Sequence, residues 1–477
     1  METFFISPSF LLLSLLAVAA SAAFSPADHY LIDCGSPRPT TLDVDHRRFA
    51  GDSSGYGSRF LTSSGSFSIN HESNPSPVYN TSPIYQTARV FTAPSNYIFK
   101  IKDQGTHMVR LHFHRIPQSK LNDCHVQFHV SANGFVLLYN FTSSSSSPQI
   151  KDFLIWIDVD ELVITFTPSK YSKLAFINAI EVISTPKDLI ADVAYSVGSA
   201  NPGRDEVNGL QKKALETSYR VTVGGVKVTP FNDSLWRTWN PDDQFLKYDV
   251  GSDRIYFGSR IYYRPGGASR EVCPDNVYNT ARVIRSSGDS LPETNMTWVF
   301  PVDGDYEYLI RLHFCDIASV SIGTIHFNVY INGKLSYYDL DLSERTNWRL
   351  ASPLYADFIS SPSEQSLISI SVGPSNASMP NGIDGILNGV EIMKMSNRMG
   401  SLDGNVCAGS ILKRWSHESY YKWNVIPVIA AACLLVTVSM AVVHKRRAWF
   451  GGDGSIAWSP LPTTSTLSEL NLKSSST

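Results

Sequence analysis

An internal repeat of short, strand-like blocks is the feature that most constrains the fold of this chain. Blocks from the first half return in the same order in the second half, and their offset drifts only from 189 residues (Tyr30 to Tyr219) to 210 residues (Ile177 to Leu387). The five pairs are Tyr30–Gly35 with Tyr219–Gly224, Ile84–Val90 with Val277–Val283, Met108–Phe113 with Leu309–Phe314, Phe128–Gly134 with Phe327–Gly333, and Ile177–Val182 with Leu387–Ile392. We interpret the repeat as a duplication of one folded module.

Each repeated block has the pattern of a β-strand. Polar Arg110 and His112 alternate with apolar Leu111 and Phe113, which is the period of two that a strand shows. An Asn-Gly pair follows a block in both halves, and this pair favours a two-residue hairpin turn because both positions need a positive φ. Since long amphipathic helices are missing between the end segments, we predict an all-β fold of two tandem β-sandwiches of the jelly-roll kind.

Apolar segments at the two ends of the chain predict where these sandwiches lie. Phe4 to Ala20 has the length and the small-residue ending of a cleaved signal peptide. Val425 to Val443 holds 19 uncharged residues, and a helix of that length spans about 28 Å, close to the hydrocarbon thickness of a bilayer. Basic residues follow from His444 to Arg447. Because positive flanks stay in the cytosol, we expect a single-pass type I protein of the plasma membrane with its amino-terminal region outside.

These observations divide the chain into seven segments. We expect a signal peptide (1–23), a first sandwich domain (24–190), a linker (191–213), a second sandwich domain (214–398), a juxtamembrane stalk (399–423), a transmembrane helix (424–443) and a cytosolic tail (444–477). The tail is rich in serine and threonine, which predicts either disorder or phosphorylation by another kinase.

Sequons and cysteines agree with an extracellular location. Five Asn-X-Ser/Thr sequons lie between the two apolar segments, at Asn80, Asn140, Asn232, Asn295 and Asn376. The five cysteines of this region are Cys34, Cys124, Cys273, Cys315 and Cys407. Because five is an odd number, at least one is expected to stay free or to pair between chains. A disulfide between Cys34 and Cys124 is possible within the first domain, although the sequence leaves the connectivity open.

Several blocks resemble the plant malectin-like receptor kinases of the FERONIA and THESEUS type. They are Tyr30–Ser36, Ala214–Arg220, Leu235–Asp242, Tyr308–Asp316 and Leu387–Ile392, and the resemblance runs on through the apolar segment to Gly454–Pro462. It implies two malectin-like domains that face the cell wall. It further implies that such an ectodomain binds pectin-like wall polysaccharide and secreted cysteine-rich peptides, the latter together with a lipid-anchored co-receptor.

The sequence departs from this family after the juxtamembrane segment, where a serine/threonine kinase is expected. No glycine-rich phosphate loop, Val-Ala-Ile-Lys strand, His-Arg-Asp loop or Asp-Phe-Gly motif occurs up to Thr477. We therefore expect a non-enzymatic receptor-like protein that signals through a partner receptor kinase or acts as a decoy. A truncated product of a receptor kinase would have the same sequence. A third hypothesis, a membrane-tethered wall-modifying enzyme, requires two carboxylates that flank a cleft.

Candidate site residues are mostly aromatic. Trp236, Trp239, Tyr262 and Tyr263 lie in an aromatic-rich stretch at the start of the second domain, where their faces would stack on sugar rings or simply fill a core. No catalytic, cofactor-binding or metal-binding residue is assigned. His112 and His114, with His313 and Cys315 at the same spacing, are interpreted as packed or hydrogen-bonded strand residues rather than as a metal site. Asp158, Asp160 and Glu161 are interpreted as a solvated turn rather than as a glycosidase or calcium site. A net charge of −3 without a basic stripe argues against nucleic-acid binding.

Overall fold

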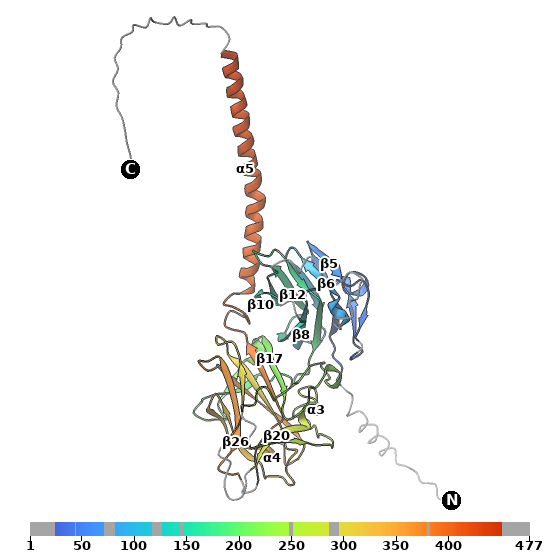
Figure 1. Cartoon of the computed structure of the whole chain (residues 1–477), viewed down its shortest axis with the longest axis vertical. Helices are drawn as coiled ribbons and strands as arrows, with labels where there is room; N and C mark the ends of the chain where they lie inside the picture. The colour runs from blue at the N-terminus through green and yellow to red at the C-terminus, as the bar shows by residue number, and fades with distance from the viewer. Residues whose placement is uncertain are drawn as a thin grey trace, which may run out of the picture. The chain divides into compact units, whose positions relative to one another are not determined.

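The computed structural model describes residues 24–42, 44–70, 82–116, 126–143, 147–247, 251–285, 295–378 and 382–450 (Figure 1). Residues up to Lys413 form one compact unit, and residues from Arg414 onward form a second one. The first unit holds both halves of the repeat and is the ectodomain of the sequence prediction.

The first half of the repeat folds into fourteen strands among the described residues. They are β1 (His29–Asp33), β2 (Thr40–Thr41), β3 (Arg48–Gly51), β4 (Leu61–Ser63), β5 (Ser66–Asn70), β6 (Thr87–Phe91), β7 (Ser95–Lys100), β8 (Gly105–Phe113), β9 (Phe128–Ala132), β10 (Phe135–Phe141), β11 (Gln149–Ile157), β12 (Glu161–Pro168), β13 (Ala175–Ile177) and β14 (Ala179–Ser184). Two single turns of helix, α2 (Gly55–Ser58) and η2 (Pro83–Tyr85), lie between them.

The second half repeats this pattern from β17 onward. Its strands are β17 (Leu215–Thr222), β18 (Asn240–Pro241), β19 (Ser252–Tyr256), β20 (Thr280–Arg285), β21 (Met296–Pro301), β22 (Tyr308–Cys315), β23 (His326–Ile331), β24 (Lys334–Asp341), β25 (Pro353–Ser360), β26 (Leu367–Pro374), β27 (Ile383–Leu387) and β28 (Gly389–Met395). Its short helices are η4 (Pro230–Asn232), α3 (Asp275–Tyr278) and α4 (Leu342–Arg345).

Strand order shows that the two halves are copies of one sandwich. The run β11-β8-β14-β1 in the first half corresponds to β25-β22-β28-β17 in the second, and β10-β9-β12-β7 corresponds to β24-β23-β26-β21. Each half has its own apolar core between its sheets, with Val109, Phe128 and Ile164 fully buried in one and Ile310, Phe327 and Ile370 in the other. The predicted all-β fold of two tandem sandwiches is confirmed.

Both Asn-Gly hairpins have the predicted backbone. Asn133 and Gly134 have φ angles of 41° and 91°, and Asn332 and Gly333 have φ angles of 52° and 72°. Each pair connects two antiparallel strands, β9 with β10 and β23 with β24. Asparagine tolerates the left-handed region better than most residues and glycine pays no steric cost there, so a local signal was sufficient to predict both turns.

One sheet runs through both domains, which the repeat did not predict. Its 13 strands include the four-strand runs of both halves, and β11 of the first half pairs antiparallel with β17 of the second. The pairing is short, with Phe153 opposite Glu216 and Leu154 opposite Leu215. We call this pairing the seam. Beside it, Met108, Leu154, Leu215, Met393 and other buried residues form an apolar cluster that belongs to both domains.

The segments predicted as linker and stalk also carry structure. Residues 191–213 contain β15 (Val193–Ser196), β16 (Glu206–Asn208) and η3 (Leu210–Lys212), and β15 pairs in parallel with β25. After β28 the chain returns to the first domain, where Leu402 is completely buried in that domain's core. Two main-chain hydrogen bonds fix it there, from Val136 N–H to Gly400 O and from Leu402 N–H to Val136 O, both 2.9 Å.

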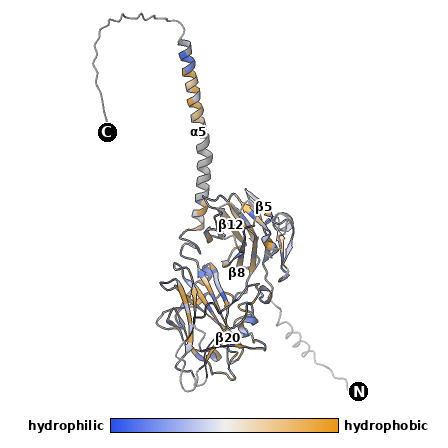
Figure 2. Cartoon of the chain, in the orientation of Figure 1, coloured by the Kyte–Doolittle hydropathy of each residue, from blue (hydrophilic) through white to orange (hydrophobic). Residues whose placement is uncertain are grey.

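The last described element is α5 (Ala408–Phe450). It contains the one described helix that is long and apolar enough to cross a membrane, over Ile429–Arg447, with a mean hydropathy of 1.5. Figure 2 colours this stretch mostly orange before a blue basic end. The predicted signal peptide and most of the predicted tail lie outside the described residues.

Candidate functional site

A groove with a volume of about 1290 Å³ lies on the second domain. One of its walls is the irregular segment 260–271, and the opposite wall includes parts of β15 and β25 together with the end of α4. Two of the predicted ligand-binding residues, Tyr262 and Tyr263, line this groove. Arg260, Arg264 and Arg345 line it as well. We call it the arginine–tyrosine groove.

Local sequence explains why segment 260–271 stays irregular. Pro265 and the two glycines after it interrupt any ladder, and Gly266 takes a φ of 75° that suits glycine. The Tyr263 hydroxyl donates to Asp275 Oδ1 at 2.6 Å, and burial with this carboxylate raises the pKa of the phenol well above its usual range. Tyr263 is therefore a fixed, neutral part of the wall. Tyr262 is 43 % exposed, with the Arg349 guanidinium 4.4 Å from its ring centroid.

Three arginines of the groove, Arg260, Arg264 and Arg345, have no carboxylate partner among the described residues, whereas Arg270 forms an ion pair with Asp275. Arg264 Nη2 donates to the main-chain oxygen of Arg345 at 2.6 Å, and Arg345 Nη2 donates to the Tyr195 hydroxyl at 3.4 Å. Arg260 is exposed. Acidic residues line the groove too: Asp188, Glu206, Glu271, Glu344 and Asp357. Guanidinium forks bind carboxylates in a bidentate manner, and tyrosine rings offer flat apolar faces. The groove therefore suits a ligand that carries both carboxylate groups and apolar surface.

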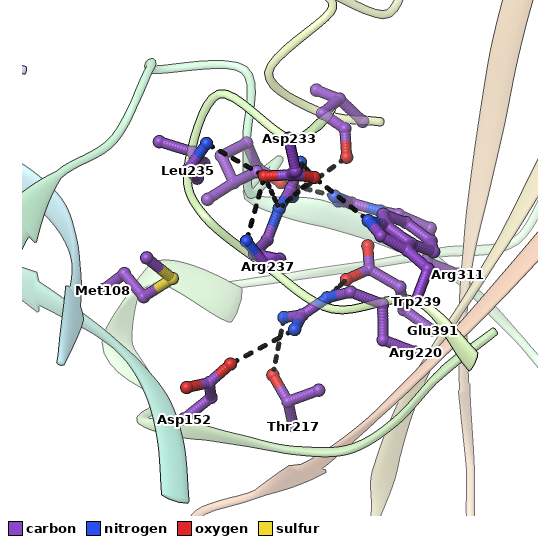
Figure 3. A network of polar contacts seen from close by, with 12 residues as sticks. Met108, Asp152, Thr217, Arg220, Asp233, Leu235, Arg237, Trp239, Arg311 and Glu391 are labelled. Atoms are coloured by element: carbon purple, nitrogen blue, oxygen red, sulfur yellow. Dashed lines mark hydrogen bonds and ion pairs between the residues drawn. The ribbon is translucent and has the colours of Figure 1, made fainter. Parts of the chain in front are cut away.

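Trp239 does not belong to a binding surface, and the expectation for this residue is corrected. It is completely buried, its Nε1 donates to Asp233 Oδ2 at 3.0 Å, and its ring lies edge-on to His313 with centroids 5.5 Å apart (Figure 3). The indole fills the core of the second domain and has no face for a sugar ring.

Trp236 lies elsewhere. It is partly exposed, has a left-handed backbone with a φ of 54°, and stacks on His29 with ring centroids 4.9 Å apart. It lines a smaller cleft beside the seam. The structure therefore brings Tyr262 and Tyr263 together in one groove and separates both from Trp236.

The first domain contains a buried chain of tyrosine, histidine and glutamate. Tyr85 Oη and His112 Nδ1 are 2.9 Å apart, and His112 Nε2 lies 2.8 Å from Glu181. Arg47 and Arg110 each donate through Nη1 to Glu181 Oε2, at 2.5 and 2.9 Å. Burial alone would raise the pKa of Glu181, but Arg110, His112 and Arg47 hold that pKa well below its usual range. Both nitrogens of His112 are thus used in hydrogen bonds.

The second domain repeats this chain. Tyr278 Oη lies 3.1 Å from His313 Nδ1, and His313 Nε2 lies 3.4 Å from Glu391. Arg220 donates to Glu391 at 2.8 Å, and its other side reaches Asp152 of the first domain at 3.2 Å (Figure 3). The ion pair from Arg220 to Asp152 crosses the seam. The hydrogen-bonded role predicted for His112 and His313 is confirmed, and the described residues contain no group of three potential metal ligands.

The three carboxylates of the first domain lie at the turn from β11 to β12. Asp158 and Asp160 are exposed, Gln104 donates to Asp160 at 3.2 Å, and Glu161 forms an ion pair with Lys100. This agrees with a solvated turn.

Four of the five predicted glycosylation sites, and one of the two cysteines of the possible disulfide, lie within the described residues. Asn140, Asn232, Asn295 and Asn376 are exposed in the structure, as glycan attachment requires, and Asn80 lies outside the described residues. Cys34 is completely buried and has no disulfide partner among the described residues, and burial raises the pKa of its thiol. Cys124 lies outside the described residues, so its pairing with Cys34 stays a prediction.

Comparison with known proteins decides the family. The sequence model of the family described as "Malectin-like domain" matches residues 32–395, which cover both sandwiches and the segment between them. The chain belongs to the malectin-like family. A probable receptor-like protein kinase of Arabidopsis thaliana is 43% identical to this malectin-like chain over 386 residues, which are 80% of this chain and 46% of the relative. THESEUS 1 of the same plant is 37% identical over 82% of this chain and 45% of its own length.

Solved structures agree with this assignment. The plant receptor-like kinase ANX2 matches with a TM-score of 0.70 and 28% identity, over 80% of this chain and 99% of the solved chain. A structure of the plant peptide RALF23 in complex with FER and LLG2 matches with a TM-score of 0.66 and 30% identity, over 80% and 99%. This malectin-like chain is thus a plant receptor-like protein whose resemblance to the FERONIA and THESEUS type is confirmed. It spans about half the length of the curated relatives it matches.

Sequence reasoning missed the groove arginines. Arg260 and Arg264 flank the tyrosine pair in sequence, but Arg345 follows about 80 residues later and Tyr195 precedes the pair by more than 60. The one local signal was the run Arg260-Ile-Tyr-Tyr-Arg264, in which basic and aromatic residues are interleaved.

Proposed function

We propose that this chain forms the extracellular part and membrane anchor of a single-pass plasma-membrane receptor that binds a secreted cysteine-rich peptide in the arginine–tyrosine groove. The observation that carries this proposal is a groove lined by Tyr262, Tyr263 and four arginines, on a fold that FER shares in its complex with RALF23 and LLG2. The same comparison supports a lipid-anchored co-receptor as a second partner.

Size and composition of the groove favour a peptide over a small molecule. Its volume of about 1290 Å³ exceeds the range of about 300–1,000 Å³ that small-molecule pockets occupy. Arginine and tyrosine are among the residues that contribute most binding energy at protein interfaces. Tyr263 and Arg270 are also held in place by Asp275, so little conformational entropy is lost there when a ligand binds.

We further propose how the receptor signals. The described domains match ectodomain structures, and a partner receptor kinase would supply the phosphoryl transfer. A chain that binds the peptide without recruiting such a kinase would act as a decoy.

A wall polysaccharide of the pectin type is the second ligand that the groove supports. Arg260 is exposed and has no carboxylate partner among the described residues, so it is available to uronate groups. An exposed ionic contact of this kind weakens with salt because the screening length falls to about 8 Å at physiological ionic strength.

The test measures binding of RALF23 to the full chain in nanodiscs, with and without LLG2. We expect Arg260→Glu and Tyr262→Ala each to weaken binding by about tenfold or more, because both side chains line the groove. Tyr171→Ala is the matched control, since Tyr171 is 83 % exposed and lies in the first domain. Unchanged affinity in both groove variants would refute the peptide site. Pectin fragments in a salt series form the second arm, and loss of their binding in Arg260→Glu would favour polysaccharide.

A further inference from the structure

The buried arginine clusters of the two domains are copies of each other. Arg110 and Arg311 occupy the same place in the repeated blocks, and so do Glu181 and Glu391. Arg47 and Arg237 are a third equivalent pair. Each lies five residues before a buried aspartate. In the first domain Asp52 accepts the N–H of Gly35 and pairs with Arg89. In the second domain Asp242 accepts the N–H of Gly224 and pairs with Arg282.

In the second domain the space over this cluster is filled by the chain itself. Arg311 Nη1 donates to the main-chain oxygen of Leu189 at 2.5 Å. Arg237 donates to two more main-chain oxygens, through Nη1 to Val272 at 3.1 Å and through Nη2 to Glu271 at 2.6 Å. A cavity of only about 10 Å³ remains beside these arginines and Leu189. Two guanidinium groups therefore bind peptide carbonyls from two separate segments.

In the first domain the equivalent space is an open cleft of about 210 Å³. Arg47, Arg110 and His112 line it and are 8 %, 4 % and 3 % exposed. Arg47 uses Nε and Nη1 on Asp45 and Glu181, and its Nη2 has no acceptor among the residues that the structure describes.

The wall that faces this cluster comes from the second domain and is polar. It contains Thr217, Ser218, Thr238 and Asn240, with Trp236 at one side. Within the described part of the chain, the side chains of Ser218, Thr238 and Asn240 make no hydrogen bond to protein. The cleft therefore offers an arginine donor on its floor and hydroxyl and amide groups on its wall, and it needs both domains to be complete.

We propose that this cleft binds a short stretch of an extended peptide, the rest of which lies outside the cleft. A main-chain carbonyl of this stretch accepts a hydrogen bond from Arg47 Nη2, as the carbonyl of Glu271 accepts one from Arg237 Nη2. In the second domain, the equivalent arginines donate hydrogen bonds to peptide carbonyls. In the first domain, the polar wall of the cleft selects small or polar side chains. A ligand held there contacts both domains across the seam. The inference rests on the proposed function only in that the ligand is a peptide, because this cleft is separate from the arginine–tyrosine groove.

The probe is the capped tetrapeptide acetyl-Ser-Arg-Glu-Val-amide, which copies residues 269–272 of the filled site. Its binding to the full chain in nanodiscs is followed by saturation-transfer NMR of the peptide, up to about 10 mM, a range that covers millimolar dissociation constants. Ser218→Trp fills the cleft and Asn240→Trp fills it from another position, so that one variant remains if the other fails to fold. Ser58→Trp is the control at an exposed serine away from the cleft.

We expect the peptide to bind the wild type and Ser58→Trp alike and to bind both cleft variants about tenfold more weakly or not at all. No binding to the wild type, or equal binding by the cleft variants, overturns the proposal. Methyl galacturonoside is tested in parallel, and a response to this sugar alone, lost in Ser218→Trp, would make the cleft a saccharide site instead. RALF23 binding distinguishes the two proposals, because it should persist in Ser218→Trp and be lost in Arg260→Glu.

Discussion

Asp33 is a buried carboxylate whose protonation state depends on pH near neutrality. It accepts hydrogen bonds from the hydroxyls of Thr40 and Thr87. Burial raises its pKa from 3.8 to about 6, and the charge of Asp52 acts in the same direction, although the hydroxyl contacts oppose both. The folded chain therefore holds a proton on Asp33 between about pH 4 and pH 6 that the unfolded chain has already released.

The first prediction concerns this proton. Because the folded pKa is raised, the charged form is penalised, and Asp33 lowers the free energy of unfolding as the pH rises from 3.8 to about 6. We expect Asp33→Asn to be more stable than wild type at pH 7, by up to about 3 kcal/mol for a shift of about two units, with the difference disappearing near pH 4. Urea unfolding of both chains across pH 4 to 7 measures it. A difference that does not change with pH would contradict the assignment.

Two tryptophans of the second domain show that the exposure of a single side chain could not be predicted from the sequence. Trp236 and Trp239 lie three positions apart and carry the same side chain, yet one is partly exposed and the other completely buried. The difference arises from the positive φ of Trp236 and from the carboxylate of Asp233, which holds Trp239 inward. Neither cause is visible in a list of aromatic residues. Tyr262 and Tyr263, both candidate ligand-binding residues, line one groove, and the sequence did not predict that groove.

At the scale of elements, the seam is a short joint between the two domains of the ectodomain. It consists of two residue pairs, supported by ion pairs from Lys151 to Glu216 at 2.6 Å and from Arg220 to Asp152 at 3.2 Å. Leu215 lies at its centre, is 2 % exposed, and belongs to the apolar cluster of both domains. A charge introduced there would lack a partner, and burying an unpaired charge costs far more than burying a polar group.

The second prediction follows for Leu215→Glu. Since one sheet joins the domains, calorimetry of the wild type should show one cooperative ectodomain transition. We expect Leu215→Glu to divide it into two transitions, with the first at a lower temperature, while Val226→Glu at a position that is 82 % exposed leaves it unchanged. One transition at the wild-type temperature in Leu215→Glu would show that the seam does not couple the domains.

Whether a strand pairing could be predicted depended on how far apart its two strands lie in the sequence. The two hairpins were predicted because Asn-Gly specifies its own backbone within two residues. The pairing of β11 with β17 joins strands about 60 residues apart through only two positions, and β15 pairs with a strand about 160 residues later. Segment 191–213 has no periodicity that would predict the pairing of β15 with β25, so this segment was expected to be a linker. The repeat predicted two sandwiches but not the sheet that they share.

For the molecule as a whole, the segment after β28 ties the two domains together. Leu402 is buried in the first domain, Asp403 Oδ2 accepts the N–H of Tyr139 in that domain at 2.9 Å, and the Gly404 N–H donates to the Tyr306 hydroxyl of the second domain at 2.7 Å. The chain passes from Arg398, which is exposed, directly into these contacts.

The third prediction tests this connection. Leu402→Ala removes a buried side chain, which typically costs about 2–5 kcal/mol, and should release the segment from β10. We expect trypsin to cut after Arg398 faster in this variant than in the wild type. Leu412→Ala is the matched control, because Leu412 is 40 % exposed and near in sequence. Equal cleavage rates in the two variants would argue that the segment is held by its main chain alone.

The return of the chain to β10 has a mechanical consequence. A force applied to residues after 406 meets the hydrogen bonds at Val136, Leu402 and Gly404 before it reaches β28. The load is therefore divided between both domains, and the final strand of the second domain is shielded from being peeled away edge-first. An anchor arranged in this manner lets the ectodomain stay folded under tension.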